Sequence, residues 1–313
     1  MKAIILKKAG GTDNLILDDI AIPLPKPNEV LVKVHAIGIN PVDVKTRKGG
    51  ALYNTLIKDP HVILGWDISG TVQALGAEVS EFKEGDEVFG MVNFPGHGKA
   101  YAAYVAAPSG HLSLKPENIS HEEAAGSTLA ALTAWQVLVY EANMKKGQHL
   151  LMHAAAGGVG HFAVQIAHYL GVKVTGTAST SNASFLKEIG VDLHSDYTQD
   201  RFEDKVQDVD VVFDPIGGET TLRSLEVIKL GGTLISIVGG VNEAVIKRAE
   251  EKNIKAKNYL VHSSGRDMKQ LAELLKQNII KPHISHTFPL EKIAEAHKQQ
   301  ESGKTRGKII ALP

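Results

Sequence analysis

The sequence predicts an α/β protein with two parts, a doubly wound parallel sheet and a second, β-rich domain. Short apolar runs separated by proline and glycine turns fill residues 1 to about 115, where helical periodicity is scarce. From Gln148 onward, strand-like and helix-like segments alternate, which is typical of right-handed βαβ units. The length of 313 residues also exceeds that of one typical domain.

The β-rich region opens with an alternating segment at Met1–Lys8. We expect its further strands at Glu29–Ile37, Gly70–Leu75, Glu87–Val92 and Tyr101–Ala106. Turn residues such as Pro23, Gly85 and Pro95 separate these runs.

The α/β region begins near Ser120, which forms a capping-box pattern with Glu123, and helical character continues through Ala130–Tyr140. Strands are expected at His149–His153, Lys173–Thr177, Val209–Asp214 and Thr233–Val238. Helices are expected at Gly158–Leu170, Asn182–Ile189 and Glu219–Lys229.

The last fifty residues depart from this alternation. They predict a helix at Asp267–Asn278, extended chain at Ile279–Phe288, a helix at Leu290–Glu301 and a strand at Lys308–Leu312. A last strand placed there can rejoin the first domain. We therefore predict one domain from residues 1–122 with 263–313, and another from residues 123–262.

Composition excludes several classes of site and partner. A net charge of −1 gives no basic excess for nucleic acid or a membrane surface. The absence of cysteine excludes disulfides, thiolate zinc sites and cysteine nucleophiles. No window of about 20 apolar residues predicts a membrane span, and the N-terminus lacks a signal-peptide core, so a cytoplasmic protein is expected.

The segment Ala154–Gly160 is a small-residue turn between a predicted strand and a predicted helix, and it matches the pattern A-x-x-G-x-x-G. Such a turn lets a pyrophosphate reach backbone N–H groups at the positive end of the helix dipole. Glycines also serve ordinary caps and turns. The position inside a βαβ unit favours a dinucleotide site.

The next strand ends at Thr177, 20 residues after Gly157 (177 − 157). A site that prefers NADH usually places an acid there to hold the ribose 2′-hydroxyl. This chain has Thr-Ala-Ser-Thr-Ser-Asn from Thr177 to Asn182, whose hydroxyls and backbone amides could donate hydrogen bonds to a 2′-phosphate. The loop thus favours NADPH, and a plain polar loop is the alternative.

Two further strand ends, Asp214–Gly218 and Val238–Gly240, lie at the same edge of the predicted sheet. Because ligands bind at the carboxyl ends of parallel strands, Gly217, Val238 and Gly239 could face the nicotinamide half of a cofactor. Ordinary strand-to-helix turns would use the same residues.

In the first domain, Pro41 cannot donate to a strand ladder, so the preceding strand must end there. The turn that follows brings the polar side chains of Asn40, Asp43 and Lys45 close together. A solvated turn is the alternative for this polar group. None of the 14 histidines, His153 included, shows H-E-x-x-H or another paired spacing, so we predict no metal site.

These segments together resemble the medium-chain dehydrogenase/reductase superfamily, and most closely its zinc-independent quinone and enone reductases. The resemblance spans the whole chain. It rests on the opening M-K-A-I, N-P-V-D-x-K, G-W-D-I-S-G, E-G-D-E-V-F-G, A-A-x-G-G-V-G and the closing G-K-I-I. It implies a GroES-like β domain and a Rossmann domain, with the active site in the cleft between them.

The zinc-dependent alcohol dehydrogenases of this superfamily place a cysteine at or beside the position of Asn40, and a G-H-E segment near Gly65–Asp67. This chain has no thiolate to offer there. Because zinc polarises the oxygen of an alcohol or carbonyl, its loss argues against alcohol oxidation. A conjugated acceptor spreads the incoming charge and needs less help.

The resemblance assigns roles to residues by motif position. Near the nicotinamide, its ribose or the substrate it places Asn40, Asp43, Lys45, Tyr53 and Thr133; at the pyrophosphate, Ala156, Gly157, Gly158, Val159 and Gly160; and at the 2′-phosphate, Ser179 and Tyr197. Asn182 lies near a basic residue that the family has and this chain lacks. Arg306 and Lys308 could approach the cofactor.

The resulting hypothesis is an NADPH-dependent oxidoreductase that transfers hydride to a quinone or an enone, mainly through proximity and orientation. Lys45 or a water would stabilise a developing enolate oxygen. The alternatives are a non-catalytic NADPH-binding redox sensor or moonlighting module, and a reductase of another activated alkene such as an acyl thioester. The family also suggests a homodimer, paired through Gly232–Val238 if this strand lies at the sheet edge.

Overall fold

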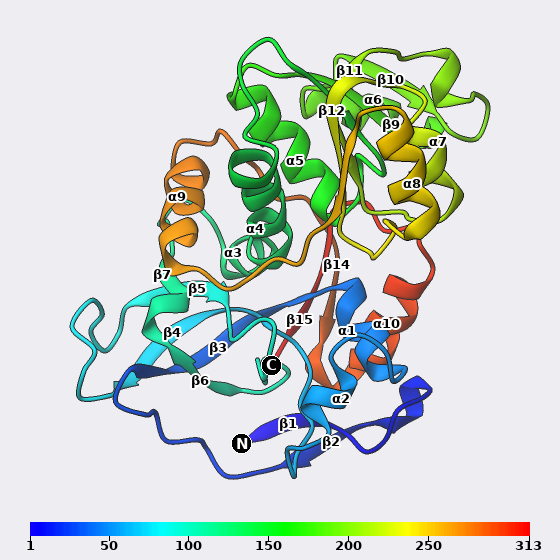
Figure 1. The fold of residues 1–313 in the computed structure, drawn as a ribbon. Coiled ribbons are helices and arrows are strands. Elements are labelled where there is room, and N and C mark those ends of the chain that lie inside the picture. Colours follow the sequence, from blue (N-terminus) through cyan, green and yellow to red (C-terminus); the bar gives the residue numbers. More distant parts are fainter. The chain divides into compact units, whose positions relative to one another are not determined.

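The computed structural model describes residues 1–313, which form two compact units. Unit 1 contains Met1–Leu132 and Val261–Pro313, and unit 2 contains Thr133–Leu260. Figure 1 shows both chain ends in unit 1.

Unit 1 is built on a seven-stranded sheet of order β14-β15-β3-β4-β5-β7, with β6 paired to β3. Its strands are β3 (Glu29–Ile39), β4 (Asp67–Leu75), β5 (Glu87–Met91), β6 (Tyr104–Pro108), β7 (Leu112–Leu114), β14 (Ile284–Pro289) and β15 (Lys308–Leu312). All pairs are antiparallel except β14 with β15. A hairpin of β1 (Lys2–Leu6) and β2 (Leu15–Asp19) forms a separate two-stranded sheet.

Five α-helices of four to twelve residues lie wholly within unit 1. They are α1 (Pro41–Arg47), α2 (Tyr53–Leu56), α3 (His121–Gly126), α9 (Gly265–Lys276) and α10 (Ile293–Glu301). Ala125 of α3 packs with Ala36 of β3 and Ile310 of β15 in one buried cluster. The last strand therefore rejoins the β-rich region in sequence-distant contact, as the sequence predicted.

Unit 2 is a six-stranded parallel sheet of order β10-β9-β8-β11-β12-β13. Its strands are β8 (His149–Met152), β9 (Lys173–Ala178), β10 (Leu193–Asp196), β11 (Val209–Asp214), β12 (Ile228–Ser236) and β13 (Lys255–Asn258). The strand order reverses between β8 and β11. Such a switch point is where doubly wound sheets bind ligands.

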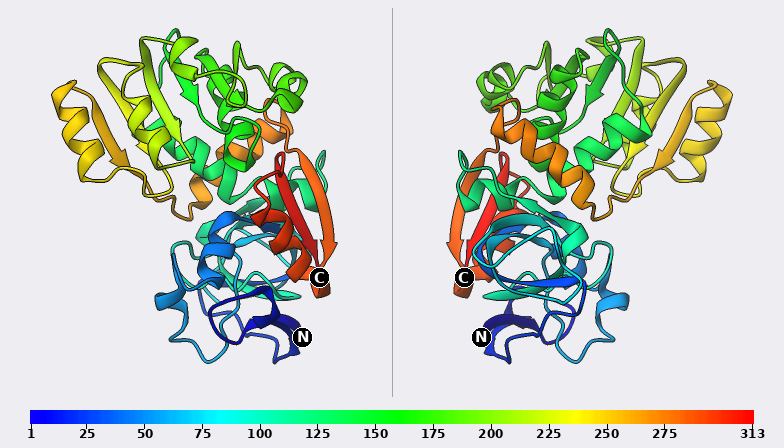
Figure 2. Two further views of the ribbon diagram at one scale, coloured as in Figure 1. Left: turned by 90° about the vertical axis from the view of Figure 1, so that its right-hand side faces the viewer. Right: turned by 90° about the vertical axis from the view of Figure 1, so that its left-hand side faces the viewer.

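Four helices connect the strands of unit 2: α5 (Gly158–Tyr169), α6 (Ala183–Glu188), α7 (Glu219–Ser224) and α8 (Glu243–Glu251). Right-handed crossovers that run in opposite directions from the switch point put α5 on one face and α7 on the other (Figure 1). Figure 2 shows the last helix and strand of unit 2, coloured yellow to orange, at one edge of its sheet.

One long helical segment passes from unit 1 into unit 2. It consists of α4 (Leu129–Trp135) followed directly by a π-helical stretch, Gln136–Glu141. The sequence predicted helical character through Ala130–Tyr140, and this is confirmed. The change to wider π-helical turns was not predicted.

Most predicted elements form, and the capping box at Ser120 is present because Glu123 N–H donates to Ser120 Oγ at 3.2 Å while Glu123 accepts from Ser120 N–H at 2.8 Å. The premise that Gly232–Val238 is an edge strand is wrong. β12 lies between β11 and β13, so β13 is the edge on that side. The helix predicted to continue to Lys229 ends at Ser224, since β12 already begins at Ile228.

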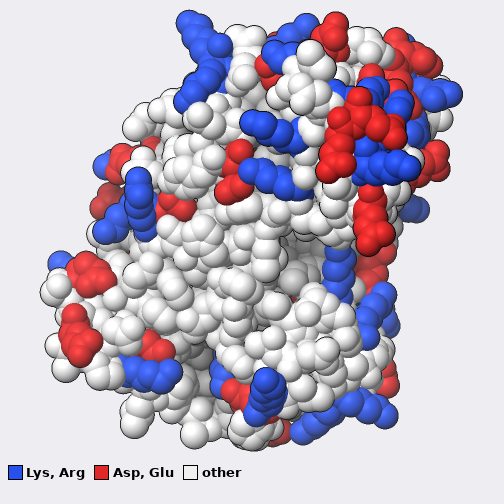
Figure 3. Space-filling model, in the orientation of Figure 1, with Lys and Arg blue, Asp and Glu red and all other residues white.

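The compact units divide the chain at Leu132 and Leu260, whereas the predicted domains divide it at residues 122 and 262. The difference arises because α3 packs on β3 and β4 and so belongs with the β-rich unit. None of the helices has the length and apolar character that crossing a bilayer requires. On the face shown in Figure 3, basic and acidic side chains are interspersed.

Candidate active site

The glycine-rich turn of unit 2 joins β8 to α5 in a tightly specified conformation. Ala154 has a positive φ of 48°, and its carbonyl accepts from Gly157 N–H at 2.9 Å. Ala155 N–H donates to the Thr177 carbonyl of β9 at 2.9 Å. The turn is therefore fastened both to itself and to the neighbouring strand.

Gly160 is required by the close approach of α5 to this turn. A Cβ at Gly160 would lie 2.2 Å from the Ala154 oxygen and 2.7 Å from Ala155 Cα. At Gly176 of β9, a Cβ would lie 2.9 Å from Ala155 Cβ. Both positions keep side chains out of the space where strand, turn and helix meet.

The N-terminus of α5 presents donors for an anion. The Gly157 carbonyl accepts the His161 N–H at 3.1 Å, so the amides of Gly158, Val159 and Gly160 precede the first hydrogen bond of the helix. Gly157 is the N-cap and brings no side chain to satisfy them. Together with the dipole of a twelve-residue helix, these amides fit a pyrophosphate.

The loop after β9 holds the residues predicted for a 2′-phosphate. Ser179 Oγ lies 3.1 Å from Ser181 Oγ and accepts from Asn182 Nδ2 at 3.0 Å. Tyr197 follows β10 and is 65% exposed, so its ring is accessible. No basic side chain lies among Ser179–Asn182, as the sequence indicated.

β10 ends at an acidic residue, Asp196, which was not predicted as a site residue. Asp196 accepts hydrogen bonds from Thr180 Oγ1 and, at 2.9 and 2.7 Å, from the N–H and Oγ1 of Thr198. These hydrogen bonds, from Thr180 foremost, hold the pKa of Asp196 below its ordinary value. A count along β9 could not find it because it comes from the adjacent strand, through Thr180.

At the two other strand ends, the polar side chains form hydrogen bonds with the backbone of their own loops. Asp214 is buried at the end of β11, and its Oδ1 accepts from Ile216 and Gly217 N–H at 2.8 and 3.0 Å. At the end of β12, Ser236 Oγ accepts from Gly240 N–H at 3.0 Å. Gly217 and Gly239 have φ of 84° and 79°, which glycine adopts without strain. Thr133 is buried on α4.

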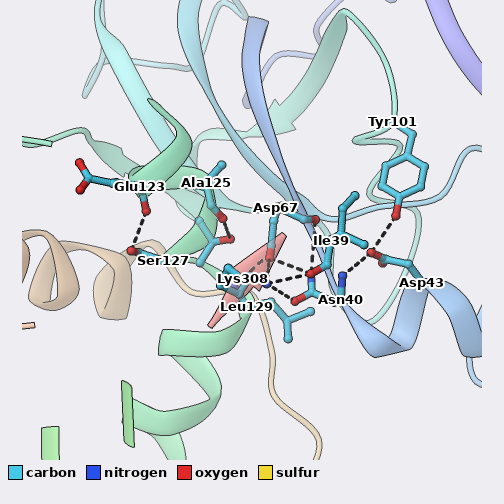
Figure 4. A network of polar contacts seen from close by, with 12 residues as sticks. Ile39, Asn40, Asp43, Asp67, Tyr101, Glu123, Ala125, Ser127, Leu129 and Lys308 are labelled. Carbon is cyan, nitrogen blue, oxygen red and sulfur yellow. Dashed lines mark hydrogen bonds and ion pairs between the residues drawn. The ribbon is translucent and has the colours of Figure 1, made fainter. Parts of the chain in front are cut away.

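In unit 1, a buried ion pair between Lys308 and Asp67 lies against the turn that follows β3 (Figure 4). Lys308 Nζ lies 3.5 Å from Asp67 Oδ2 and donates to the Ile39 carbonyl at 3.1 Å and to Asn40 Oδ1. Asn40 Nδ2 donates to Asp67 Oδ2 at 2.8 Å. Asp67 Oδ1 also accepts from Leu129 N–H at 3.0 Å, which joins β4 to the start of α4.

A second group of buried polar side chains, Asp43, Tyr101 and His297, is connected to this ion pair through Asn40. Asp43 Oδ2 accepts from Asn40 N–H at 2.7 Å and from the Tyr101 hydroxyl at 2.9 Å, and that hydroxyl lies 3.0 Å from His297 Nε2. Burial raises the pKa of Asp43 to about 7 and lowers that of His297 to about 3. Tyr101 and His297 were not predicted as site residues.

Lys45 and Tyr53 lie apart from this buried group. Lys45 is on the exposed side of α1, and its side chain makes no hydrogen bond or ion pair. Tyr53 is half-buried, and its hydroxyl accepts from Ala9 N–H at 3.2 Å. Of the predicted residues in unit 1, the structure therefore brings together Asn40, Asp43 and Lys308 only.

Comparison with known proteins places these features in a family. Family models match residues 26–117, as an alcohol dehydrogenase GroES-like domain, and residues 189–310, as a zinc-binding dehydrogenase. The chain is 34% identical over 324 residues to the 2-methylene-furan-3-one reductase of Solanum lycopersicum, covering 100% of this chain and 79% of that protein. It is 34% identical over 323 residues to the chloroplastic NADPH-dependent alkenal/one oxidoreductase of Arabidopsis thaliana, covering 100% and 80%.

The chain belongs to the medium-chain dehydrogenase/reductase superfamily. The solved structure of the quinone oxidoreductase from Coxiella burnetii matches it with a TM-score of 0.94 and 35% identity, covering 100% of this chain and 99% of that one. The GroES-like and Rossmann-type folds that the resemblance implied are thereby confirmed, and with them the quinone and enone reductase branch of the superfamily.

Membership of this superfamily does not bring the zinc ligands of its alcohol dehydrogenases. No group of three His, Cys, Asp or Glu side chains is placed to hold a metal ion, although one matching model describes a zinc-binding dehydrogenase. The cation beside Asp67 is the ammonium of Lys308. The contacts of Asn40 and Lys308 are internal to unit 1, and their roles toward a cofactor or substrate stay predictions.

Proposed function

We propose that this chain is an NADPH-dependent oxidoreductase that reduces a quinone or an α,β-unsaturated carbonyl without zinc. The single observation that carries the proposal is the turn at Gly160, where backbone atoms of Ala154 and Ala155 exclude any side chain. The names of the relatives support the same activity: an alkenal/one oxidoreductase described as NADPH-dependent, a furanone reductase and a quinone oxidoreductase.

Unit 2 would hold the cofactor. Amides of Gly158, Val159 and Gly160 would bind the pyrophosphate, with Ala156 and Gly157 shaping the turn, and the loops at Gly217, Val238 and Gly239 would bound the nicotinamide half together with Thr133. Hydroxyls of Ser179 and Tyr197 would donate hydrogen bonds to the 2′-phosphate. When bound, NADPH supplies a hydride from its nicotinamide C4.

The carboxylate of Asp196 bears on the strength of the preference. It lies one hydrogen bond from Thr180, within the loop that would take the 2′-phosphate, and no lysine or arginine of that loop offsets it. Like charges repel most where water does not screen them. We therefore expect the preference for NADPH over NADH to be modest.

In unit 1, Asn40 and Asp43 would act by fixing α1. Both of their side chains are committed to buried hydrogen bonds at the first turn of that helix. The rigid helix leaves Lys45 exposed and unpaired, so its ammonium is available to stabilise negative charge on a carbonyl oxygen as it develops. Tyr53 would line the substrate side.

The chain is also proposed to form a homodimer. β13 is a sheet edge whose backbone N–H and C=O groups on one side have no strand partner in the chain. Pairing with a two-fold mate would cover this edge, and light scattering that gave the mass of one chain would contradict it. A cytoplasmic location stays a prediction.

The activity is tested by following NADPH consumption with a panel of quinones, 2-alkenals and enones, beside equilibrium binding of NADPH and NADH. We expect turnover with at least one acceptor class and tighter binding of NADPH. Binding without turnover across the panel would favour a non-catalytic NADPH-binding module. Absence of binding to either nucleotide would refute the proposal.

A further inference from the structure

His153, the residue between β8 and the glycine-rich turn, lies in a continuous chain of hydrogen bonds within unit 2. Its Nδ1 is 3.1 Å from Thr177 Oγ1 of β9, and its Nε2 is 2.9 Å from Ser224 Oγ of α7. Thr177 Oγ1 in turn accepts the Ala154 N–H at 3.2 Å. The imidazole therefore connects the turn to two elements that are distant in sequence.

The partners decide which ring nitrogen carries the proton. Ser224 Oγ donates to the Thr220 carbonyl at 2.7 Å, so its remaining capacity toward His153 is as an acceptor, and Nε2 must be the N–H. Nδ1 is then a lone pair that accepts the Thr177 hydroxyl hydrogen. All the hydrogen bonds run one way from Ala154 N–H to Nδ1, and one way from Nε2–H to the Thr220 carbonyl.

Its surroundings keep this ring neutral. His153 is buried, and its ring packs edge-on against Phe202 with centroids 4.9 Å apart. Burial lowers the pKa of His153 to about 4, so the imidazole carries no charge at neutral pH. An added proton on Nδ1 would replace the Thr177 hydroxyl hydrogen in this hydrogen bond, so that hydroxyl would lose its acceptor.

We infer that His153 is a positioning residue for the pyrophosphate-binding turn. By accepting the Thr177 hydroxyl hydrogen, it fixes the position of Thr177 Oγ1, and this oxygen accepts the N–H of Ala154 and so holds that residue in its left-handed conformation. The inference rests on the proposed function, since it assigns this residue to the cofactor site named there. Its reach is local. The left-handed Ala154 supplies the carbonyl that accepts Gly157 N–H and lies against Gly160.

The two arms of the imidazole have separate consequences. The Nδ1 arm runs through Thr177 to Ala154 and so sets the conformation of the turn. The Nε2 arm runs to α7, beside the Asp214 loop, where Asp214 accepts from Thr221 Oγ1 and already anchors the helix. Losing the Nδ1 arm should therefore loosen the turn, whereas losing the Nε2 arm leaves α7 with a second anchor.

Three substitutions separate these arms. His153→Asn places an acceptor near the Nδ1 position and keeps the Thr177 arm, His153→Gln places a donor near the Nε2 position and keeps the Ser224 arm, and His153→Leu keeps neither. We expect the Kd for NADPH to stay within about threefold of wild type in His153→Asn and to rise about tenfold in His153→Gln and His153→Leu. A tenfold rise corresponds to the loss of about one hydrogen bond.

His149 provides the matched control. It begins β8, and its Nε2 lies 2.8 Å from Thr175 Oγ1 of β9, so it makes the same kind of cross-strand bond away from the turn. His149→Leu should lower the melting temperature and leave the Kd unchanged. A merely structural role for His153 would instead lower stability equally in the Asn and Gln variants without separating their affinities.

Two readouts on the cofactor-free protein complete the test. In wild type, nitrogen-15 NMR should show His153 protonated at Nε2 and unprotonated at Nδ1, and exchange of the Ala154 amide should be faster in His153→Gln than in His153→Asn. The opposite tautomer, or equal exchange and equal affinity in the two variants, would overturn the inference. Failure of wild type to bind NADPH would instead refute the proposed function, while amide exchange still decides the role of His153.

Discussion

Replacing Gly160 with alanine would put a methyl group where the first turn of α5 meets the backbone of the glycine-rich turn. The added Cβ would lie 2.2 Å from the Ala154 oxygen, against 3.4 Å for ordinary contact. Helix or turn must therefore move by about 1.2 Å, the difference between these distances. The contacted atoms are backbone, so no side chain can rotate away.

The size of the effect follows from that displacement. Overpacking of this kind costs about 1–3 kcal/mol, from which the better helix propensity of alanine recovers about 0.5–1 kcal/mol. We therefore expect a net loss of about 0–2.5 kcal/mol in the free energy of unfolding. The amides that would hold the pyrophosphate shift by a similar distance, and losing a hydrogen bond to a charged group costs about 1.5–3 kcal/mol of binding free energy.

The assay is a fluorescence titration of NADPH beside a denaturant melt of the same preparation. Gly110→Ala is the matched control, because a Cβ there meets nothing within 4 Å and the residue does not need a positive φ. We expect the Kd of Gly160→Ala for NADPH to rise about 10- to 100-fold, which corresponds to a loss of about 1.4–2.7 kcal/mol in binding free energy. The Kd of the control should stay unchanged. A folded Gly160→Ala protein with wild-type affinity would refute the assignment of this turn to the cofactor.

Three further predictions concern charge. Lys308→Met leaves Asp67 buried without its cation and should cost about 3–5 kcal/mol in a denaturant melt, with partial recovery in the double variant that adds Asp67→Asn; an unchanged melt would contradict the buried pair. The folded-state pKa of Asp43, about 7, exceeds its ordinary 3.8, so the folded state binds the extra proton and Asp43 reduces stability as pH rises from 4 to 7. Asp43→Asn should therefore gain stability relative to wild type over that window, by up to about 4 kcal/mol, and parallel pH profiles would show that the shift is absent. Asn182→Lys adds a cation beside Ser179 and should strengthen NADPH binding up to about fivefold while NADH binding stays constant; equal gains for both nucleotides would place the 2′-phosphate elsewhere.

Strands with apolar runs and clear turn residues could be predicted from the sequence with accurate bounds. β11 and β15 have the predicted limits because Val209–Asp214 and Lys308–Leu312 are apolar segments between turns. β13, Lys-Ala-Lys-Asn, could not be predicted, since an edge strand needs only backbone pairing and this one has no buried residue. β10 is also an edge strand and could not be predicted for a related reason: its Leu193 is exposed and its buried residues, Ser195 and Asp196, are polar, so it shows no apolar run.

The site divides along similar lines. The turn at Ala154–Gly160 is local, and the strand, turn and helix that define it follow one another in the chain. Tyr101 and His297 could not be linked to Asp43, because they lie 58 and 196 residues from their partners along the chain. His153 shows no paired ligand spacing in the sequence, and the direction of its hydrogen bonds depends on Ser224, 71 residues away.

The central claim is hydride transfer from NADPH to a conjugated acceptor, and isotope transfer tests it most directly. NADPH carrying deuterium in place of both hydrogens at the nicotinamide C4 should be mixed with the protein and a 2-alkenal, and the product analysed by mass spectrometry. We expect a saturated aldehyde with one deuterium at its β-carbon. Reduced product without deuterium, or bound NADPH with no reduced product from either alkenals or quinones, would contradict it.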